Sequence, residues 1–263
     1  MTPILMLGAG RMGGALIEGW RAAGAFSPAD LIIRDPHPGP AATAAAEAGA
    51  RLNPPDADLA QAKTVVLAVK PQAWREVAGE VSSKLAPDAV IVSIAAGVKA
   101  ADISRAFGGR TVARVMPTTA AAIGQGTASL YAVDPQARAR TRTLFAAVGV
   151  VVDLADEELM HVATAVSGSS PAYLYAFVEA LEAGGVAAGL TPDAAASLVR
   201  STMAGAAALM AKSADPPPEL RRQVTSPGGT TQAALDVLMG EQGFGPLLRH
   251  AVAAAVKRSK ELG

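Results

Sequence analysis

The chain contains no cysteine in its 263 residues, which excludes disulfide cross-links and thiolate chemistry. Basic and acidic residues number 23 each and form no block of like charge, so neither a nucleic-acid partner nor an acidic membrane partner is expected. The high hydrophobic content comes largely from alanine, and no run of about twenty strongly apolar residues predicts a membrane span. A small-molecule ligand is therefore expected.

The first residues show no targeting pattern. Met1-Thr2-Pro3 leads directly into the apolar residues 4–7, which are too few and too uncharged for a signal or transit peptide. We therefore expect a cytoplasmic protein. The length of the chain suits two domains, each large enough to bury a core.

Short aliphatic runs alternate with helical segments from residue 3 to about residue 153. This alternation predicts an α/β fold with a Rossmann-type, doubly wound, parallel-rich sheet. The expected strands are 4–7, 31–33, 64–69, 89–93, 111–115, 127–132 and 148–152. We place a dinucleotide-binding domain at residues 1–155.

No strand pattern follows residue 156, so residues 156–263 are predicted to form an all-helical substrate and dimerisation domain. Its expected helices are 156–166, 171–189, 192–213, 217–225, 231–241 and 244–261. The acids at positions 156–158 should favour the dipole of the first of these helices. Many helix faces carry alanine or glycine and bury little area, which favours packing against a second copy of the chain.

The expected first strand is followed by Gly8-Ala9-Gly10-Arg11-Met12-Gly13, which opens a helix. This is the dinucleotide fingerprint in its required context. The second strand ends at Arg34 and Asp35, where an acid suits the ribose of NAD and an arginine suits the 2′-phosphate of NADP. Both cofactors remain open, NADP(H) or NAD(H).

Two further segments lie at the carboxyl ends of expected strands, where such sheets bind their ligands. They are Ala68-Val69-Lys70-Pro71 and Ala95-Ala96-Gly97. Their small residues leave room for a nicotinamide, although an ordinary tight turn fits each segment as well.

A loop rich in glycine and hydroxyl groups, Ser226-Pro227-Gly228-Gly229-Thr230-Thr231, separates two expected helices. Thr230 or Thr231 is predicted to cap the second helix. Backbone N–H groups at a helix N-terminus attract anions, so the loop suits a small carboxylate. The alternative interpretation is a plain, capped interhelical linker.

The sequence gives little support for metal catalysis or for a nucleophilic triad. The histidines are scattered, no His-Glu-x-x-His pattern occurs, and Gly168-Ser169-Ser170 is not a nucleophile elbow, so no metal and no catalytic triad are predicted. The helical residue His161 is expected to be packed or at the surface rather than a ligand. The three histidines are His37, His161 and His250.

The nucleotide-binding pattern, the segment 164–173 (TAVSGSSPAY) and the segment 224–231 (VTSPGGTT) together resemble pyrroline-5-carboxylate reductase. The similarity spans essentially the whole chain, and Arg114-Val115-Met116-Pro117 also matches the family. The chain departs from it at Thr118 and Ala120, where the family usually has asparagine and proline. The resemblance implies hydride transfer to the C=N bond of 1-pyrroline-5-carboxylate, giving L-proline in the last step of its biosynthesis.

The resemblance also implies roles for residues of this chain. The loop would bind the substrate carboxylate, and a hydroxyl group or an ordered water would protonate the ring nitrogen. It further implies an interlocked homodimer of the helical domains, sometimes assembled into larger rings. The substrate-binding candidates are Ser226, Gly228, Gly229, Thr230 and Thr231, and the catalytic candidates are Thr164, Ser226 and Thr231.

Two alternatives stay open at this point. A two-domain dehydrogenase of the hydroxyacid type generally places a lysine inside its helical domain, and Lys212 and Lys257 are the interior candidates here. Neither lies in a matching motif. A nucleotide-binding scaffold without turnover is the other alternative, and its mark would be decay of the hydroxyl-bearing loop, which is intact.

Overall fold

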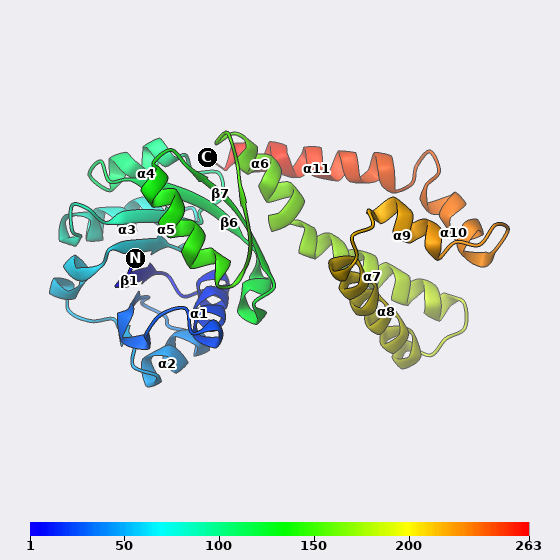
Figure 1. Ribbon diagram of the computed structural model, residues 1–263, viewed down its shortest axis with the longest axis horizontal. Coiled ribbons are helices and arrows are strands. Elements are labelled where there is room, and N and C mark those ends of the chain that lie inside the picture. Colours follow the sequence, from blue (N-terminus) through cyan, green and yellow to red (C-terminus); the bar gives the residue numbers. More distant parts are fainter. Residues whose placement is uncertain (263) are drawn as a thin grey trace. The chain divides into compact units, whose positions relative to one another are not determined.

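The computed structural model describes residues 1–262 (Figure 1). The chain divides into two compact units, which we call the sheet unit, residues 1–168 with 255–262, and the helical unit, residues 169–254. The residue pattern placed a boundary at 155/156 instead. Residues 159–168 pack with the sheet unit because they contact its strands β6 (Val112–Pro117) and β7 (Gly126–Ala132).

The sheet unit contains an eight-stranded sheet in the order β3-β2-β1-β4-β5-β6-β7-β8. Neighbouring strands pair in parallel except for β6 and β7, which are antiparallel. The parallel-rich sheet predicted from the sequence is confirmed, and the short strand β3 is an addition to it. The remaining strands are β1 (Ile4–Leu7), β2 (Leu31–Arg34), β3 (Arg51–Leu52), β4 (Thr64–Leu67), β5 (Val90–Ser93) and β8 (Gly149–Asp153).

Helices cover both faces of the sheet and also make up the helical unit. A π-helical turn at Thr164–Gly168 follows α6. The helices are α1 (Arg11–Ala23), α2 (Pro40–Glu47), α3 (Trp74–Val81), α4 (Ala100–Ala106), α5 (Pro135–Ala146), α6 (Leu159–Ala163), α7 (Ser170–Ala187), α8 (Pro192–Lys212), α9 (Pro217–Gln223), α10 (Thr230–Leu238) and α11 (Phe244–Glu261).

Two apolar cores lie on opposite faces of the sheet. In β1, Ile4 and Met6 join the core under α1, α2 and α5, whereas Leu5 and Leu7 join the core under α3 and α4 (Figure 1). Alternate residues of a strand point to opposite faces, so a strand covered on both sides is apolar throughout. Because β1, β4 and β5 are adjacent and parallel, their carboxyl ends lie along one edge, where the predicted nucleotide segments lie.

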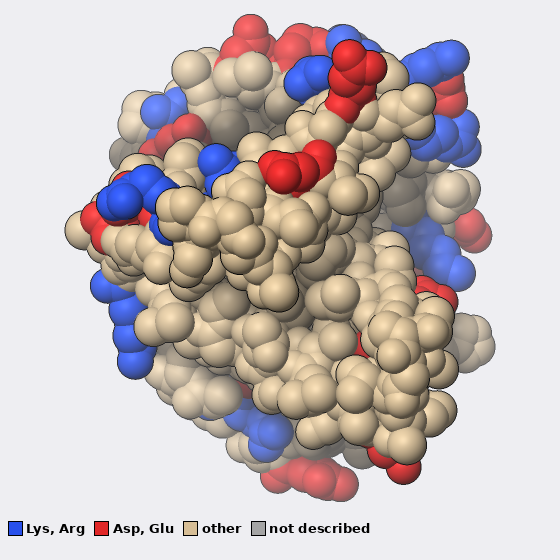
Figure 2. All heavy atoms as spheres, turned by 90° about the vertical axis from the view of Figure 1, so that its right-hand side faces the viewer, with Lys and Arg blue, Asp and Glu red and all other residues tan. Residues whose placement is uncertain are grey.

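The helical unit buries very little of its own surface. Ala195 is the single buried residue in α7, α8, α9 and α10. Large aliphatic side chains such as Leu198, Leu209 and Val237 are exposed. Figure 2 shows that few charged side chains lie on the face of this unit that is turned to the viewer. These helices therefore present an apolar surface that the single chain does not cover.

Helix α8 is the one described helix that is long and apolar enough to cross a bilayer by length and composition. Its hydropathy comes largely from alanine, and it carries Arg200, which pairs with Glu182 of α7 at 2.7 Å.

The acids that precede α6 accept hydrogen bonds from backbone N–H groups. Helix α6 begins at Leu159 and has no acid in its first turn. Asp156 accepts the Glu158 N–H at 2.9 Å, and Glu157 accepts the N–H of Ala100 at the start of α4. The helix therefore starts later than the expected residue 156, and Glu158 lies at its N-cap rather than within its first turn.

Candidate functional site

The loop between β1 and α1 has the geometry of a phosphate cradle. Gly8 has φ +91°, and a Cβ there would lie 3.0 Å from the backbone of Ala68. A Cβ on Gly13 would collide with the Gly8 carbonyl. At the start of α1, Gly10 supplies no side-chain cap, and a Cβ built on it meets nothing within 4 Å. The helix N-terminus therefore faces open space, which is what a pyrophosphate group requires.

Asp35 braces this loop from the end of β2. Its carboxylate accepts the Ala9 N–H at 2.5 Å and the His37 N–H at 2.7 Å, and the residue is 9% exposed. The backbone of Asp35 is held in turn by Asn53, whose side chain accepts from the Asp35 N–H and donates to its carbonyl. The sequence assigned Asp35 to the ribose, and the structure adds a role in shaping the glycine loop.

Arg34 points toward the turn that follows β3. Its guanidinium donates to the Pro54 carbonyl at 2.7 Å and pairs with Asp56 at 2.6 Å. A hydrogen bond from Lys84, with Arg34 also nearby, holds the pKa of Asp56 below its usual value. The Arg34 charge is thus partly balanced within the protein, although its side chain keeps about a third of its surface exposed.

The structure brings the predicted nucleotide segments together. Gly8 donates to the Arg34 carbonyl at 2.9 Å, and Ala68 donates to the Leu7 carbonyl at 2.8 Å. Ile94, just before the segment 95–97, donates to the Leu67 carbonyl at 3.2 Å. The segments at 8–13, 34–35, 68–71 and 95–97 therefore form one continuous edge of the sheet. A dinucleotide fits this edge, since its cradle, open helix end and small residues are all present.

The predicted substrate loop lies in the helical unit and is exposed. Gly228 has φ +66°, which favours glycine, and Gly229 donates to the Ser226 carbonyl at 3.0 Å. Helix α10 begins at Thr230 with Gly229 at its N-cap, and no side chain caps it. The expected cap by Thr230 or Thr231 is therefore wrong, because glycine occupies the capping position. The first N–H groups of α10 are left without a side-chain acceptor.

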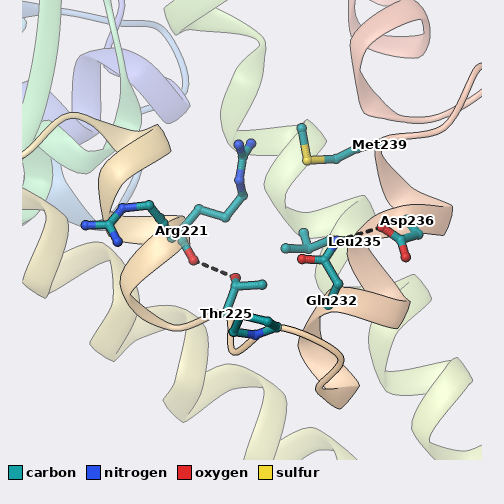
Figure 3. Close-up of a pocket in the computed structure, with 8 residues that line it drawn as sticks. Arg221, Thr225, Gln232, Leu235, Asp236 and Met239 are labelled. Atoms are coloured by element: carbon teal, nitrogen blue, oxygen red, sulfur yellow. Dashed lines mark hydrogen bonds between the residues drawn. The ribbon is translucent and has the colours of Figure 1, made fainter.

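A hollow of about 540 Å³ lies on the flank of this loop (Figure 3). Thr225 donates to the Arg221 carbonyl at 2.6 Å, and Gln232 donates to Asp236 at 2.6 Å, so these polar groups are already paired. Pro227 is the one member of 226–231 that lines the hollow, and Gln232 in the first turn of α10 also lines it. The lining residues are Arg221, Arg222, Thr225, Pro227, Gln232, Leu235, Asp236 and Met239.

Thr164 lies in the sheet unit, at the first position of the π-helical turn. Its hydroxyl donates to the Met160 carbonyl at 2.7 Å, so its proton is used within the helix. The end of the same turn packs on β6, since a Cβ on Gly168 would lie 3.2 Å from Met116. The turn therefore carries Thr164 next to the end of β6.

Two family models and a known relative match this chain. Residues 157–262 match the family model described as pyrroline-5-carboxylate reductase dimerisation, and residues 3–97 match the one described as NADP oxidoreductase coenzyme F420-dependent. The pyrroline-5-carboxylate reductase of Pseudomonas aeruginosa is 40% identical over 267 residues, which cover 99% of this chain and 97% of that protein. The chain belongs to the pyrroline-5-carboxylate reductase family. The resemblance recognised in the sequence is confirmed.

Solved structures of pyrroline-5-carboxylate reductases share the fold of this family member. The Coxiella burnetii structure is 30% identical with a TM-score of 0.90, and it covers 100% of this chain and 98% of its own. The Plasmodium falciparum structure, determined with NADP bound, is 27% identical with a TM-score of 0.86 and the same coverage of both chains.

Further features of this chain concern points raised by the sequence. The Thr118 hydroxyl, where the family usually has asparagine, accepts the Thr127 N–H at 3.0 Å and so helps to start β7. Lys212 and Lys257, the interior candidates for a hydroxyacid-type dehydrogenase, are both exposed in the chain. Within residues 1–262, no group of three or more His, Asp or Glu residues could hold a metal ion.

Sequence reasoning gave no role in the site to Asn53, Arg114 or Glu157, although Arg114 lies in a segment that resembles the family. Asn53 carries one local signal, since it adopts φ +47° just before two prolines, where asparagine is favoured. Arg114 is buried on β6 and pairs with Glu157 at 2.9 Å. Their separation of 43 positions leaves no local pattern from which the pair could be inferred.

Proposed function

We propose that this chain reduces 1-pyrroline-5-carboxylate to L-proline with NADPH or NADH as the electron donor. Membership of the pyrroline-5-carboxylate reductase family over nearly the full chain is the observation that carries this proposal. The glycine cradle, with its open helix end and its bracing by Asp35, supports it independently. Reduced nicotinamide, when bound, supplies the hydride that the C=N carbon accepts.

In this proposal the cofactor binds along the edge of the sheet formed by the segments 8–13, 34–35, 68–71 and 95–97. The N–H groups at the start of α1 bind the pyrophosphate, and Gly8 and Gly13 let the backbone approach it. The segment 68–71 and the segment 95–97 line the nicotinamide end with small side chains. Arg34 and Asp35 flank the ribose, where an arginine favours NADPH and an acid favours NADH. The proposal therefore covers both cofactors.

The loop 226–231 orients the substrate. The uncapped N–H groups at the start of α10 bind the ring carboxylate, assisted by the positive end of the helix dipole. Gly228 and Gly229 keep side chains away from the approach, and the Ser226 and Thr231 hydroxyls add hydrogen-bond capacity. Orientation of the C=N carbon toward the hydride supplies most of the rate acceleration.

Protonation of the ring nitrogen completes the reaction. Thr164, Ser226, Thr231 and an ordered water are the candidate donors, because no buried carboxylic acid or histidine lies in the motifs. Since the Thr164 proton points at the Met160 carbonyl, donation from Thr164 requires that this hydrogen bond break. The hydroxyl groups of Ser226 and Thr231 belong to exposed residues of the substrate loop.

We further propose that the protein is a cytoplasmic homodimer or higher homo-oligomer, built through its C-terminal helices. The match to the dimerisation model over residues 157–262 indicates homo-oligomerisation. Exposed aliphatic side chains on α8 and α10 supply the apolar surface that isologous pairing needs. Pairing would cover the surface that the single chain leaves open.

Purified protein mixed with 1-pyrroline-5-carboxylate, with the absorbance of NADPH and NADH followed in parallel, tests the function. We expect oxidation of at least one cofactor, with L-proline as the product. No oxidation of either cofactor would overturn the proposal. A faster rate with NADPH would indicate that Arg34 sets the cofactor preference, and a faster rate with NADH would indicate that Asp35 does.

A further inference from the structure

Glu157 lies in the turn before α6, but its carboxylate binds two distant segments. Its Oε1 accepts the Ala100 N–H at 2.6 Å and a hydrogen bond from the Arg114 guanidinium at 2.9 Å. Ala100 is the first residue of α4, and Arg114 lies on β6 with 2% of its surface exposed. One carboxylate oxygen therefore joins the turn, the buried centre of β6 and the start of α4.

This contact closes one end of the segment proposed to line the nicotinamide, residues 95–97. At the other end, the Ser93 hydroxyl accepts the Ala95 N–H at 3.2 Å, and Ser93 is the β5 partner of Arg114. A second ion pair, between Lys99 and Glu158 at 3.4 Å, is exposed. The segment is thus held at its start by Ser93 and at its end by Glu157.

Glu157 also fixes the start of the segment that carries Thr164. This segment runs from the turn at Glu157 through α6 to Gly168, where it packs on Met116. Arg114 and Met116 both lie on β6, so one strand holds both ends of the segment. The same carboxylate therefore positions a predicted cofactor-contacting segment and a predicted hydroxyl donor relative to one strand.

We propose that Glu157 is a positioning residue for hydride transfer, which it serves by holding residues 95–97 and the Thr164 segment in one arrangement. The proposal rests on the reductase function stated above. A charge-assisted hydrogen bond to a partly buried carboxylate that also pairs with a buried arginine is short and directional, so it restrains a backbone more than a neutral contact does. The rate of a reaction between two bound groups falls when either group is displaced by about 1 Å. A backbone segment that loses its hydrogen bond moves on that scale.

Ala100→Pro removes the contact between Glu157 and Ala100 without breaking the ion pair between Glu157 and Arg114. Proline removes the N–H that Glu157 binds and leaves Glu157 beside Arg114. Ala100 is the first residue of α4, where proline is tolerated, and Lys99 already has the extended conformation that precedes proline. We expect kcat to fall about tenfold, the primary isotope effect from deuterated NADPH or NADH to rise, and KM for pyrroline-5-carboxylate to change much less.

Hydrogen exchange of the protein without cofactor gives a readout independent of activity. We expect faster exchange across residues 94–99 in Ala100→Pro, with the rest of the sheet unchanged. Lys99→Gln is the matched control, since it breaks the adjacent exposed ion pair and should retain wild-type kcat and exchange. Glu157→Asp is the second variant, because it keeps a carboxylate near Arg114 but shortens the reach to Ala100, and it should show the same changes.

The proposal is overturned if the folded variants retain wild-type kcat and isotope effect, or if exchange across residues 94–99 does not change. A loss of kcat that only follows the unfolded fraction, with an unchanged isotope effect, also overturns it, because that is a purely structural role. If the wild-type protein oxidises neither cofactor, the reductase function fails instead. The exchange measurement then still decides whether Glu157 holds the segment.

Discussion

The sheet unit and the helical unit differ in how they bury apolar surface. In the sheet unit, two cores enclose both faces of the central strands. In α7 to α10 of the helical unit, Ala195 alone is buried, and aliphatic side chains face outward. A unit with its own core is stable by itself, whereas helices that bury so little gain their stability from association. The difference indicates that the helical unit, which lies within the region matched by the dimerisation model, is the part of the chain that associates.

The largest effect is expected from Gly13→Ala, which attacks the sheet unit alone. The added Cβ would collide with the Gly8 carbonyl and force apart the turn and α1. We expect cofactor affinity to fall on the order of 100-fold, with the oligomeric state unchanged. Fluorescence titration with NADPH and light scattering after gel filtration measure the two properties. Wild-type affinity in this variant would show that the close approach is not required.

The next effect tests the helical unit with a pair of matched valines. Val237 on α10 is 76% exposed and Val133 in the sheet unit is 77% exposed. Val237→Asp should weaken self-association at least about tenfold, since it places a charge in an apolar contact, whereas Val133→Asp should not. Sedimentation over a range of concentrations measures both. Equal behaviour of the two variants would contradict the assignment of assembly to the helical unit.

Thr231→Ala tests the substrate loop within the helical unit. We expect KM for pyrroline-5-carboxylate to rise about tenfold, as for a lost hydrogen bond to a charged group, with cofactor affinity retained. Thr225→Ala serves as the control, because the Thr225 hydroxyl is already bound to the Arg221 carbonyl. Steady-state kinetics with each substrate varied separate the two constants. Equal loss for substrate and cofactor would indicate that the loop only starts a helix.

The smallest effect concerns the C-terminal end of α11, which belongs to the sheet unit. His161 is buried, its Nδ1 lies 2.9 Å from the Ser259 hydroxyl, and burial is the main cause that holds its pKa below the ordinary histidine value of about 6.5. The unfolded chain binds a proton near that value while the folded chain does not, so stability is full above it. Stability is then lost as the pH falls toward the lowered pKa, by at most about 1.4 kcal/mol per pH unit.

Urea unfolding at pH 7.5, 6.5 and 5.5 checks this dependence, with His161→Gln as the comparison. The variant should show a flatter profile over the same range, because it has no proton to bind at that position. An identical slope in both proteins would assign the acid sensitivity to other groups.

Much of the fold was predictable from local patterns. The strands of the sheet are short aliphatic runs, and Gly8 to Gly13 follow the first of them in the spacing that a dinucleotide requires. The helices of residues 156–263 were also found, because prolines and glycines mark their ends. Strand β3 was missed because two residues carry no periodicity. Strand β7 was predicted, but its antiparallel orientation was not, because orientation depends on the partner strand rather than on the strand's own pattern.

The candidate site was predictable in its segments but not in its internal contacts. The segments at 8–13, 34–35 and 68–71 were named from the sequence, and the structure places them along one edge of the sheet. The bracing of Ala9 by Asp35 spans 26 positions, and the contact of Glu157 with Ala100 spans 57. Such contacts follow from the packing of strands and turns and have no local signature.

The sequence by itself determined the family, the cofactor class and the glycine loops, because these depend on residue types at short and fixed spacings. Tertiary structure alone decided that Asp35 binds the glycine loop, that Glu157 bonds to β6 and α4, and that Gly229 rather than a threonine occupies the N-cap of α10. The physical reason is the reach of the interactions. Steric and turn preferences act over a few residues, whereas buried hydrogen bonds join whichever segments the folded chain brings within about 3 Å.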